Sequence, residues 1–184
     1  VILLILYIVY ENHTRNKELL KYAQTDALTG LYNKETTEQL TDELLSEDEN
    51  KYHAFLILDV DCFKQINDIY GHAVGDIVLQ KFGKLLKGTF REGDILGRIG
   101  GDEFGVIMKN IQTKDIAMKK AEELLAKTQA YKIDELKGNN ISISIGISTA
   151  PQDGDCYMDL YKRADQALYQ AKRSGKARVC NYFS

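Results

Sequence analysis

The order of apolar segments between residues 53 and 149 limits the fold of this chain more than any other feature. Residues 53–59 form a short apolar run typical of a buried strand. Helical spacing follows, then two short strand-like runs, helical spacing again and a period-two strand. This order predicts a β-α-β-β-α-β core of ferredoxin-like or palm type. We therefore expect an α+β domain with an antiparallel sheet, helices on one side, extra helices around the core and an N-terminal helix before it.

The expected elements have clear limits in the sequence. We predict helices over residues 34–45, 113–130 and 157–173, and two helical patterns that break at Gly71 within residues 61–88. Strands are predicted over residues 53–59, 94–99, 104–108, 141–149 and 177–183. Residues 141–149 alternate apolar and polar side chains, which predicts one buried face.

Acidic residues stand where this topology brings two segments together. The first and third strands of such a sheet are neighbours, so the end of the first lies beside the turn before the third. Asp59 and Asp61 stand at the end of the first strand, and Asp102 and Glu103 lie in the turn. Carboxylate oxygens are the ligands that hard divalent cations prefer. These residues favour a metal-dependent nucleotide site, and solvated turn residues are the alternative.

Three features favour the site over solvated acids. Asp59 ends a buried run, where a charge needs a partner. Asp61 is expected to cap the following helix, whose free N–H groups attract phosphate. The pair Gly100 and Gly101 lets a ligand approach the backbone closely.

Charge and cysteine content exclude several classes of protein. The chain has 24 Lys and Arg against 27 Asp and Glu, a net charge of −3, which argues against a nucleic-acid partner. The three cysteines show no CxxC spacing, so neither a disulfide framework nor a zinc site is indicated. They fit a reducing cytoplasm.

Residues 1–10 are uncharged and strongly apolar. Ten helical residues rise about 15 Å, whereas a bilayer core needs about 20 residues. We expect these residues to be the end of a transmembrane helix, followed by a polar linker helix, so that residues 1–24 precede one domain over residues 25–184. A buried or dimer-forming helix is the alternative.

Residues 25–180 resemble the GGDEF-domain diguanylate cyclases. The signature Gly-Gly-Asp-Glu-Phe stands at residues 100–104. Further family motifs follow the same order and spacing, at residues 26–33, 58–76, 142–148 and 163–172. The resemblance implies condensation of two GTP into cyclic di-GMP with release of two pyrophosphates. It also implies a homodimer with one GTP in each subunit, and two Mg²⁺ ions, or Mn²⁺ in their place.

The resemblance also implies roles for residues around the acids. Asp59 and Asp102 are similar to the side-chain metal ligands, with the Val60 carbonyl as a backbone ligand. Asp59, Asp102 and Glu103 together correspond to the catalytic group. Together with the apolar residues 1–10, the resemblance implies a membrane-anchored protein of the bacterial inner membrane whose catalytic domain lies in the cytoplasm.

Asn67 and Asp76 are similar to the residues that bind guanine. A carboxylate suits the N1–H and N2–H donors of guanine, which adenine lacks, so Asp76 favours GTP over ATP. An ordinary helix-end or turn role is the alternative for both residues.

Four positions are similar to the phosphate-binding residues: Phe63, Lys64, Lys172 and Lys176. Phe63 and Lys64 begin the helix after the first strand, where backbone N–H groups face phosphates. Lys176 departs from the usual Arg, so it keeps the charge but loses the bidentate fork. An exposed cation at a helix end is the alternative for Lys172.

Arg91 and Asp94 are similar to the RxxD inhibitory site, five residues before the signature. In the family this site binds the product, so we expect inhibition by cyclic di-GMP. Two rival functions remain at this stage: a catalytically silent receptor for GTP or cyclic di-GMP, and a scaffold that dimerises through its N-terminal helix.

Overall fold

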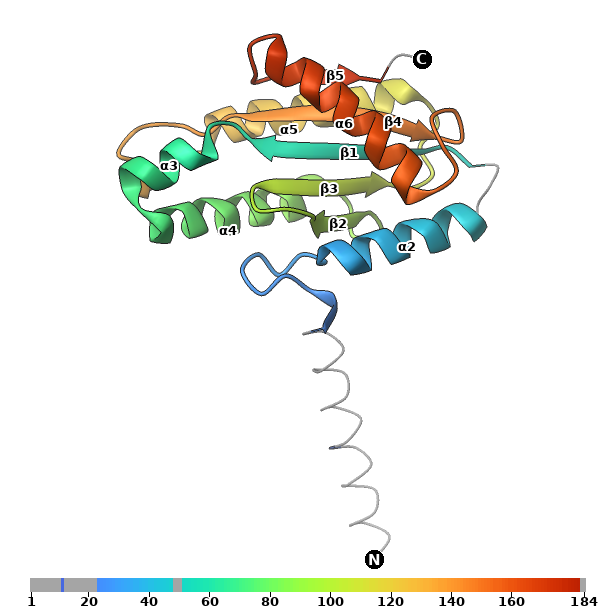
Figure 1. The fold of residues 1–184 in the computed structure, drawn as a ribbon, viewed down its shortest axis with the longest axis horizontal. Helices are drawn as coiled ribbons and strands as arrows, with labels where there is room; N and C mark the ends of the chain where they lie inside the picture. The colour runs from blue at the N-terminus through green and yellow to red at the C-terminus, as the bar shows by residue number, and fades with distance from the viewer. Residues whose placement is uncertain (1–10, 12–22, 48–50, 183–184) are drawn as a thin grey trace, which may run out of the picture.

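A mixed β-sheet forms the centre of the computed structural model, which describes residues 11, 23–47 and 51–182 (Figure 1). Its strand order is β2-β3-β1-β4-β5. The strands are β1 (His53–Val60), β2 (Ile95–Arg98), β3 (Glu103–Met108), β4 (Ile143–Ala150) and β5 (Val179–Asn181). β1 is antiparallel to both of its neighbours, β3 and β4, whereas β5 is parallel to β4. The predicted α+β core is confirmed, with β1 and β3 side by side.

The helices match the predicted segments closely. They are α2 (Lys34–Glu47), α3 (Phe63–Tyr70), α4 (His72–Thr89), α5 (Lys114–Ala130) and α6 (Tyr157–Arg173), with a short 3-10 turn, η1 (Asp134–Leu136). Gly71, with φ of 88°, separates α3 from α4, as its place between two helical patterns predicted. The last strand is shorter than predicted.

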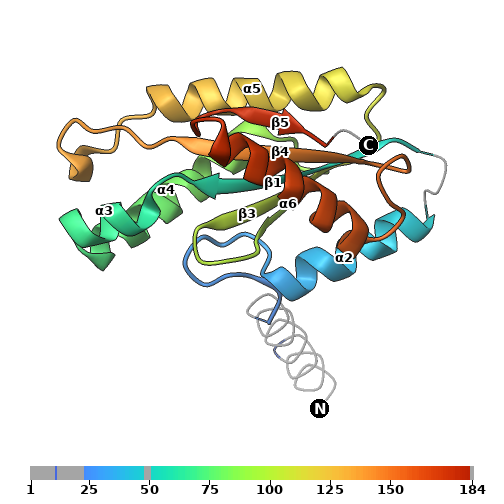
Figure 2. The same cartoon turned by 45° about the horizontal axis from the view of Figure 1, so that its top comes forward.

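Helices cover both faces of the sheet, so the expectation of helices on one side is wrong (Figure 2). Side chains alternate along β1: Leu56 and Leu58 join the core under α4 and α5, whereas Phe55 and Ile57 join a second core under α6 and α2. The reason is that α6 returns from the end of β4 across the face opposite α4 and α5.

β4 is buried along its whole length, which corrects the prediction of one buried face. Its polar positions lie under α6 instead of in water. Ser148 Oγ donates a 2.8 Å hydrogen bond to the Leu160 carbonyl of α6. Small hydroxyl side chains keep the period-two pattern in the sequence and yet satisfy their hydrogen bonds when a helix covers them.

The predicted location in the inner membrane is overturned by the helices that the structure describes. None of them is long and apolar enough to cross a bilayer. The longest, α4, has 18 residues, carries four charged side chains and packs against the sheet. Residues 1–10, on which the prediction depended, lie outside the described residues.

Candidate active site

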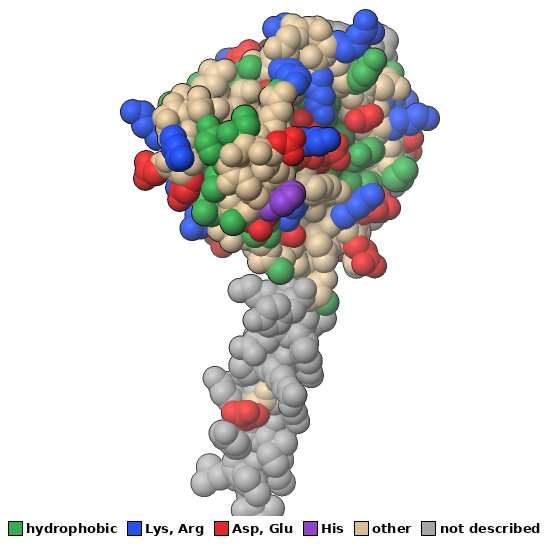
Figure 3. Space-filling model, turned by 60° about the vertical axis from the view of Figure 1, so that its left-hand side comes forward, with side chains coloured by type: hydrophobic (Ala, Val, Ile, Leu, Met, Phe, Trp, Pro, Cys, Tyr) green, Lys and Arg blue, Asp and Glu red, His purple; other side chains and the backbone are tan. Residues whose placement is uncertain are grey.

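The predicted catalytic acids Asp59, Asp102 and Glu103 converge at one end of the sheet. The end of β1, the start of α3 and the β2–β3 hairpin lie together at the left of Figure 1. The register pairs Asp59 of β1 with Glu103 of β3. The Val60 amide donates to the Asp102 carbonyl at 3.2 Å, which joins the strand end to the hairpin. Viewed from this side, acidic and basic side chains lie next to each other (Figure 3).

Asp59 is the most deeply buried of the predicted catalytic acids, with 7% of its surface exposed. Its Oδ2 accepts a 2.6 Å hydrogen bond from Lys172 Nζ, near the end of α6. Burial raises the pKa of Asp59 above its ordinary value, although the Lys172 ammonium opposes that rise. The charges of Asp102 and Glu103 act in the same direction as burial. The pKa of Asp59 is therefore raised mainly by burial, and the two neighbouring carboxylates add to that rise.

The hairpin that carries Asp102 is braced by Arg98. The guanidinium of Arg98 donates to the Gly101 carbonyl at 2.7 and 3.1 Å. It also forms a 3.2 Å ion pair with Asp26 in the loop before α2. Sequence reasoning assigned no role to Arg98 or Asp26, although Asp26 begins the motif at residues 26–33 and Arg98 stands two residues before the signature. The contact between them joins residues 72 positions apart, and no local pattern in the sequence predicts it.

Asp61 does not cap α3, contrary to the prediction. The residue before α3 is Cys62, and no side-chain hydrogen bond caps the helix. The carboxylate of Asp61 instead accepts hydrogen bonds from Ser142 Oγ and Ser144 Oγ, at 2.8 and 2.7 Å. It also accepts one from the Ala177 amide at 3.1 Å. These donors come from the start of β4, from the residue position just before it, and from the loop after α6.

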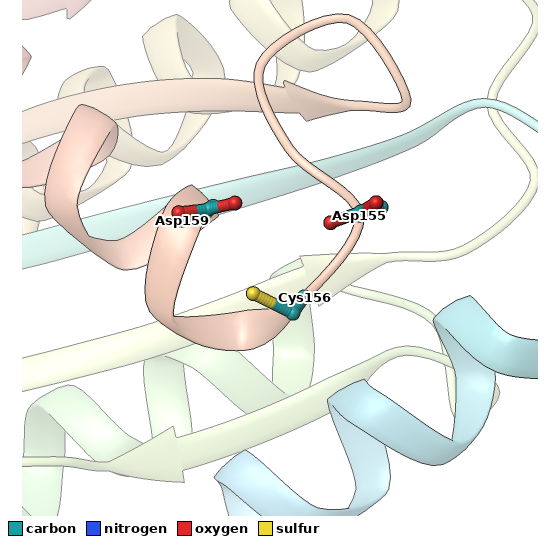
Figure 4. Close-up of side chains that lie close together, drawn as sticks. All are labelled: Asp155, Cys156 and Asp159. Carbon is teal, nitrogen blue, oxygen red and sulfur yellow. The ribbon is translucent and has the colours of Figure 1, made fainter.

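The residues at this end fit a hard divalent cation by their chemistry. Asp59, Asp102 and Glu103 supply only oxygen donors, and their mutual charges help to raise the pKa of Asp59. They do not form a closed set of ligands, however. Among the described residues, Asp155, Cys156 and Asp159 are the group whose ligand atoms all lie within 4.8 Å of one another (Figure 4). That group lies at the opposite end of α6, and its two acids are exposed.

Asn67 and Asp76 lie on either side of the α3–α4 junction. A Cβ at Gly75 would come within 1.9 Å of Asn67 Oδ1, so the amide lies directly against α4 at this glycine. Asp76 is the next residue and is exposed. The packing of α3 on α4 thus brings Asn67 next to the residue that precedes Asp76.

The predicted phosphate residues surround the start of α3. Phe63 is half-buried and packs against the core, which fixes the first turn, whereas Lys64 is exposed. Lys176 comes from the loop after α6, and its Nζ lies 3.1 Å from Cys62 Sγ. Lys172 contacts Asp59 as described above, so cations from two positions approach this helix terminus.

Arg91 and Asp94 contact each other in the loop between α4 and β2. Arg91 Nε forms a 3.0 Å ion pair with Asp94 Oδ1. The Lys109 amide donates to the same oxygen at 3.1 Å, and Arg91 Nη2 donates to the Lys109 carbonyl. Pockets of about 520 and 620 Å³ lie beside the pair, and both residues line each of them.

Comparison with curated proteins gives relatives over most of the chain. It is 37% identical over 170 residues to Diguanylate cyclase A of Treponema denticola, a match that covers 89% of this chain and 46% of the relative. It is also 37% identical over 177 residues to the Response regulator PleD of Caulobacter vibrioides, covering 92% of this chain and 39% of the relative. The chain thus spans less than half the length of either relative.

Solved structures share the fold. The coiled coil and GGDEF domain of DgcB from Caulobacter crescentus, solved in complex with c-di-GMP, gives a TM-score of 0.87 at 25% identity, covering 95% of this chain and 94% of that one. The GGDEF domain of PA1120 (TpbB or YfiN) from Pseudomonas aeruginosa gives a TM-score of 0.81 at 33% identity, and the match covers 86% of this chain and 94% of that one. The sequence profile described as "Diguanylate cyclase, GGDEF domain" matches residues 23–178. The chain therefore belongs to the GGDEF-domain family of diguanylate cyclases.

Proposed function

We propose that this chain condenses two GTP molecules into cyclic di-GMP and two pyrophosphates. The observation that carries the proposal is the convergence of buried Asp59 with Asp102 and Glu103 at one sheet end, with Lys172 beside them. Nucleotidyl transfer needs charge compensation around a polyphosphate, and this cluster combines oxygen donors for a metal with cations for the phosphates.

Asp59, Asp102 and the Val60 carbonyl would hold the metal, Mg²⁺ or alternatively Mn²⁺. Bound there, the ion would supply Lewis-acid activation of the attacking hydroxyl and neutralise the leaving pyrophosphate. The burial of Asp59 beside two further carboxylates supports this assignment, because a divalent cation would stabilise their charged forms. Glu103 belongs to the same catalytic group through its pairing with Asp59.

GTP would be oriented from both of its ends. Asn67 and Asp76 hydrogen-bond the guanine edge, with the carboxylate accepting from N1–H and N2–H. Lys172 and Lys176 pair with the phosphates, and the first residues of α3, Phe63 and Lys64, present backbone N–H groups to them. The close packing of Asn67 on Gly75 supports this assignment, since it fixes the amide next to Asp76.

Two copies of the chain have to act together in this proposal. Each chain offers one set of these residues, and cyclic di-GMP contains two guanosine units. The 3′-hydroxyl of each nucleotide therefore attacks the α-phosphorus of the nucleotide held by the other copy. We infer a homodimer in which the two sheet ends face each other.

Product inhibition at Arg91 and Asp94 is the regulatory part of the proposal. A guanidinium can stack on a guanine or grip its edge, and a carboxylate accepts its N–H donors. Their contact with each other and with Lys109 occupies the same groups, so product binding would exchange these contacts for new ones. Arg91→Ala should turn over GTP but lose inhibition by cyclic di-GMP, and unchanged sensitivity would contradict this assignment.

Chromatography after incubation with GTP and Mg²⁺ tests the proposed activity. Cyclic di-GMP is expected from the wild type, and Asp102→Ala should lower turnover by at least about 100-fold without unfolding the domain. Asp115→Ala is the matched control, because Asp115 is an exposed acid in the first turn of α5. Guanine-nucleotide binding without product, from protein confirmed to be dimeric, would refute the enzyme and favour the silent receptor.

A further inference from the structure

Asp61 joins three parts of the site that are far apart in the sequence. Its side chain is buried, with 6% of the residue exposed. The donors are Ser142 directly before β4, Ser144 within β4, and the Ala177 amide in the loop after α6. A buried carboxylate requires such donors, and in return it holds the donors in place.

The loop after α6 is held in an unusual backbone conformation. Lys176 and Ala177 have φ angles of 62° and 49°, and the facing Cys62 has 58°. Residues other than glycine adopt this left-handed region at an energetic cost, so the surroundings must hold them there. The Lys176 amide donates to the Ala171 carbonyl at 3.1 Å, and Asp61 takes the next amide along the chain.

The conformation of this loop determines where the Lys176 ammonium lies. Its Nζ lies 3.1 Å from Cys62 Sγ, directly before the first turn of α3. A lysine has a flexible four-carbon stem and a point charge, so a fixed backbone is the main restraint on its position. An arginine would add a rigid fork of its own.

We propose that Asp61 is a positioning residue that fixes the loop after α6, so that Lys176 meets the phosphates of the nucleotide at the start of α3. The inference rests on the proposed function, because it assumes a guanine nucleotide at this sheet end. Asp61 touches neither substrate nor metal in this account and acts through the Ala177 amide and Lys176.

The sign of the effect separates this role from simple electrostatics. Removing a negative charge near a phosphate site should by itself strengthen anion binding. Loss of positioning should weaken it. Asp61→Asn is nearly isosteric but cannot accept all three hydrogen bonds, since one carboxylate oxygen becomes an NH₂ donor.

A second buried aspartate offers a matched control. Asp153 is 3% exposed and accepts hydrogen bonds from the Thr149 amide and hydroxyl at the opposite end of β4, at 2.7 and 2.9 Å. Asp153→Asn therefore removes a similar charge and similar hydrogen bonds far from the nucleotide. It should lower stability and leave nucleotide affinity unchanged.

Calorimetric titration tests the proposal with the α,β-methylene analogue of GTP and with guanosine, both in the presence of Mg²⁺. Asp61→Asn should weaken binding of the triphosphate analogue about tenfold and leave the affinity for guanosine unchanged. Lys176→Met should have the same effect. The double variant Asp61→Asn/Lys176→Met should bind the analogue no more weakly than Lys176→Met alone, because both changes remove the same contact between Lys176 and the phosphates. Tighter or unchanged binding of the analogue, an equal loss for guanosine, or additive losses would each overturn the proposal.

Two further measurements keep the inference separate from folding and from the proposed activity. If Asp61→Asn does not fold, Ser142→Ala removes one hydrogen bond to Asp61 and is judged by the same criteria. Amide exchange in residues 174–178 should quicken in either variant. A wild type that binds the analogue but makes no cyclic di-GMP refutes the proposed function alone, whereas product formation with additive losses refutes the positioning role alone.

Discussion

Gly146 of β4 lies directly against the backbone of α6, and replacing it with alanine tests how the packing of this helix sets the site. A Cβ at this position would lie 2.1 Å from the Ala164 carbonyl oxygen and 2.4 Å from the Leu168 amide nitrogen. Both atoms belong to the helix backbone, so no side-chain rotation relieves the overlap. Interiors are close-packed, so α6 has to move away from β4 by more than about 1 Å.

The cost of Gly146→Ala follows from this displacement. Overpacking a buried position costs about 1–3 kcal/mol when side chains can adjust. Here the added Cβ meets backbone atoms of α6, so the core under the helix has to open. We therefore expect the free energy of unfolding to fall by about 3 kcal/mol or more. For a domain of this size that lowers the Tm by roughly 6–12 °C. The same movement separates Lys172 Nζ from Asp59, now 2.6 Å apart, so turnover should fall as well.

Denaturant unfolding of Gly146→Ala beside Gly88→Ala is the measurement. Gly88 lies in the exposed part of α4, and a Cβ there would meet nothing within 4 Å. Its replacement should stabilise the protein by about 0.5–1 kcal/mol, because alanine loses less conformational entropy in a helix. A cost below about 1 kcal/mol for Gly146→Ala would show that α6 does not pack backbone against backbone as described.

Three other changes have defined outcomes. Hydrogen bonds from Thr29 and the Arg98 guanidinium hold the pKa of Asp26 below its ordinary value of 3.8, although burial opposes them. A carboxyl whose pKa is lower in the folded protein stabilises the fold at pH values above the pKa of the unfolded chain. Asp26→Asn should therefore be less stable than the wild type at pH 7. Unfolding titrations should show this stability difference vanishing as the pH falls below the folded-state pKa of Asp26. In EDTA, Lys172→Met should lower the free energy of unfolding by roughly 1–2 kcal/mol, because Asp59 loses its partly exposed partner. Adding Mg²⁺ should raise the stability of this variant more than that of the wild type. An equal gain in both proteins would contradict the assignment of Asp59 as a metal ligand. Asp76→Asn should raise the KM for GTP by at least about tenfold in steady-state assays, and an unchanged KM would remove Asp76 from the guanine site.

Local patterns predicted the elements of this fold well, because each depends on nearby residues. The two helical patterns broken at Gly71 and the turn before β3 are properties of short windows. The covering of both sheet faces was missed for the opposite reason. In β4 the serines have the polarity of a solvent face, and only α6, a separate segment, makes that face buried.

The site divides in the same way. Asp59 and Asp102 were expected to lie close together because the topology requires it, and the register brings the end of β1 beside the hairpin. The contacts that support these acids join distant positions: Arg98 with Asp26, and Asp61 with Ala177, 116 residues away. A single sequence does not contain the pairing information for such contacts.

The strand geometry explains why α6 and the loop after it contact both Asp59, near the end of β1, and Asp61, directly after it. Side chains at alternate positions of β1 share a face, and Asp59 lies on the face covered by α6, opposite Ser144 of β4. Asp59 accepts a hydrogen bond from the Lys172 ammonium of α6, and Asp61 accepts one from the Ala177 amide in the loop that follows the same helix. The spacing between α6 and β4, set where Gly146 meets the helix backbone, therefore controls both contacts at once. A substitution that lifts α6 should consequently disturb the proposed metal ligand and the proposed phosphate lysine together, whereas changes within α4 or α5 on the other face should not.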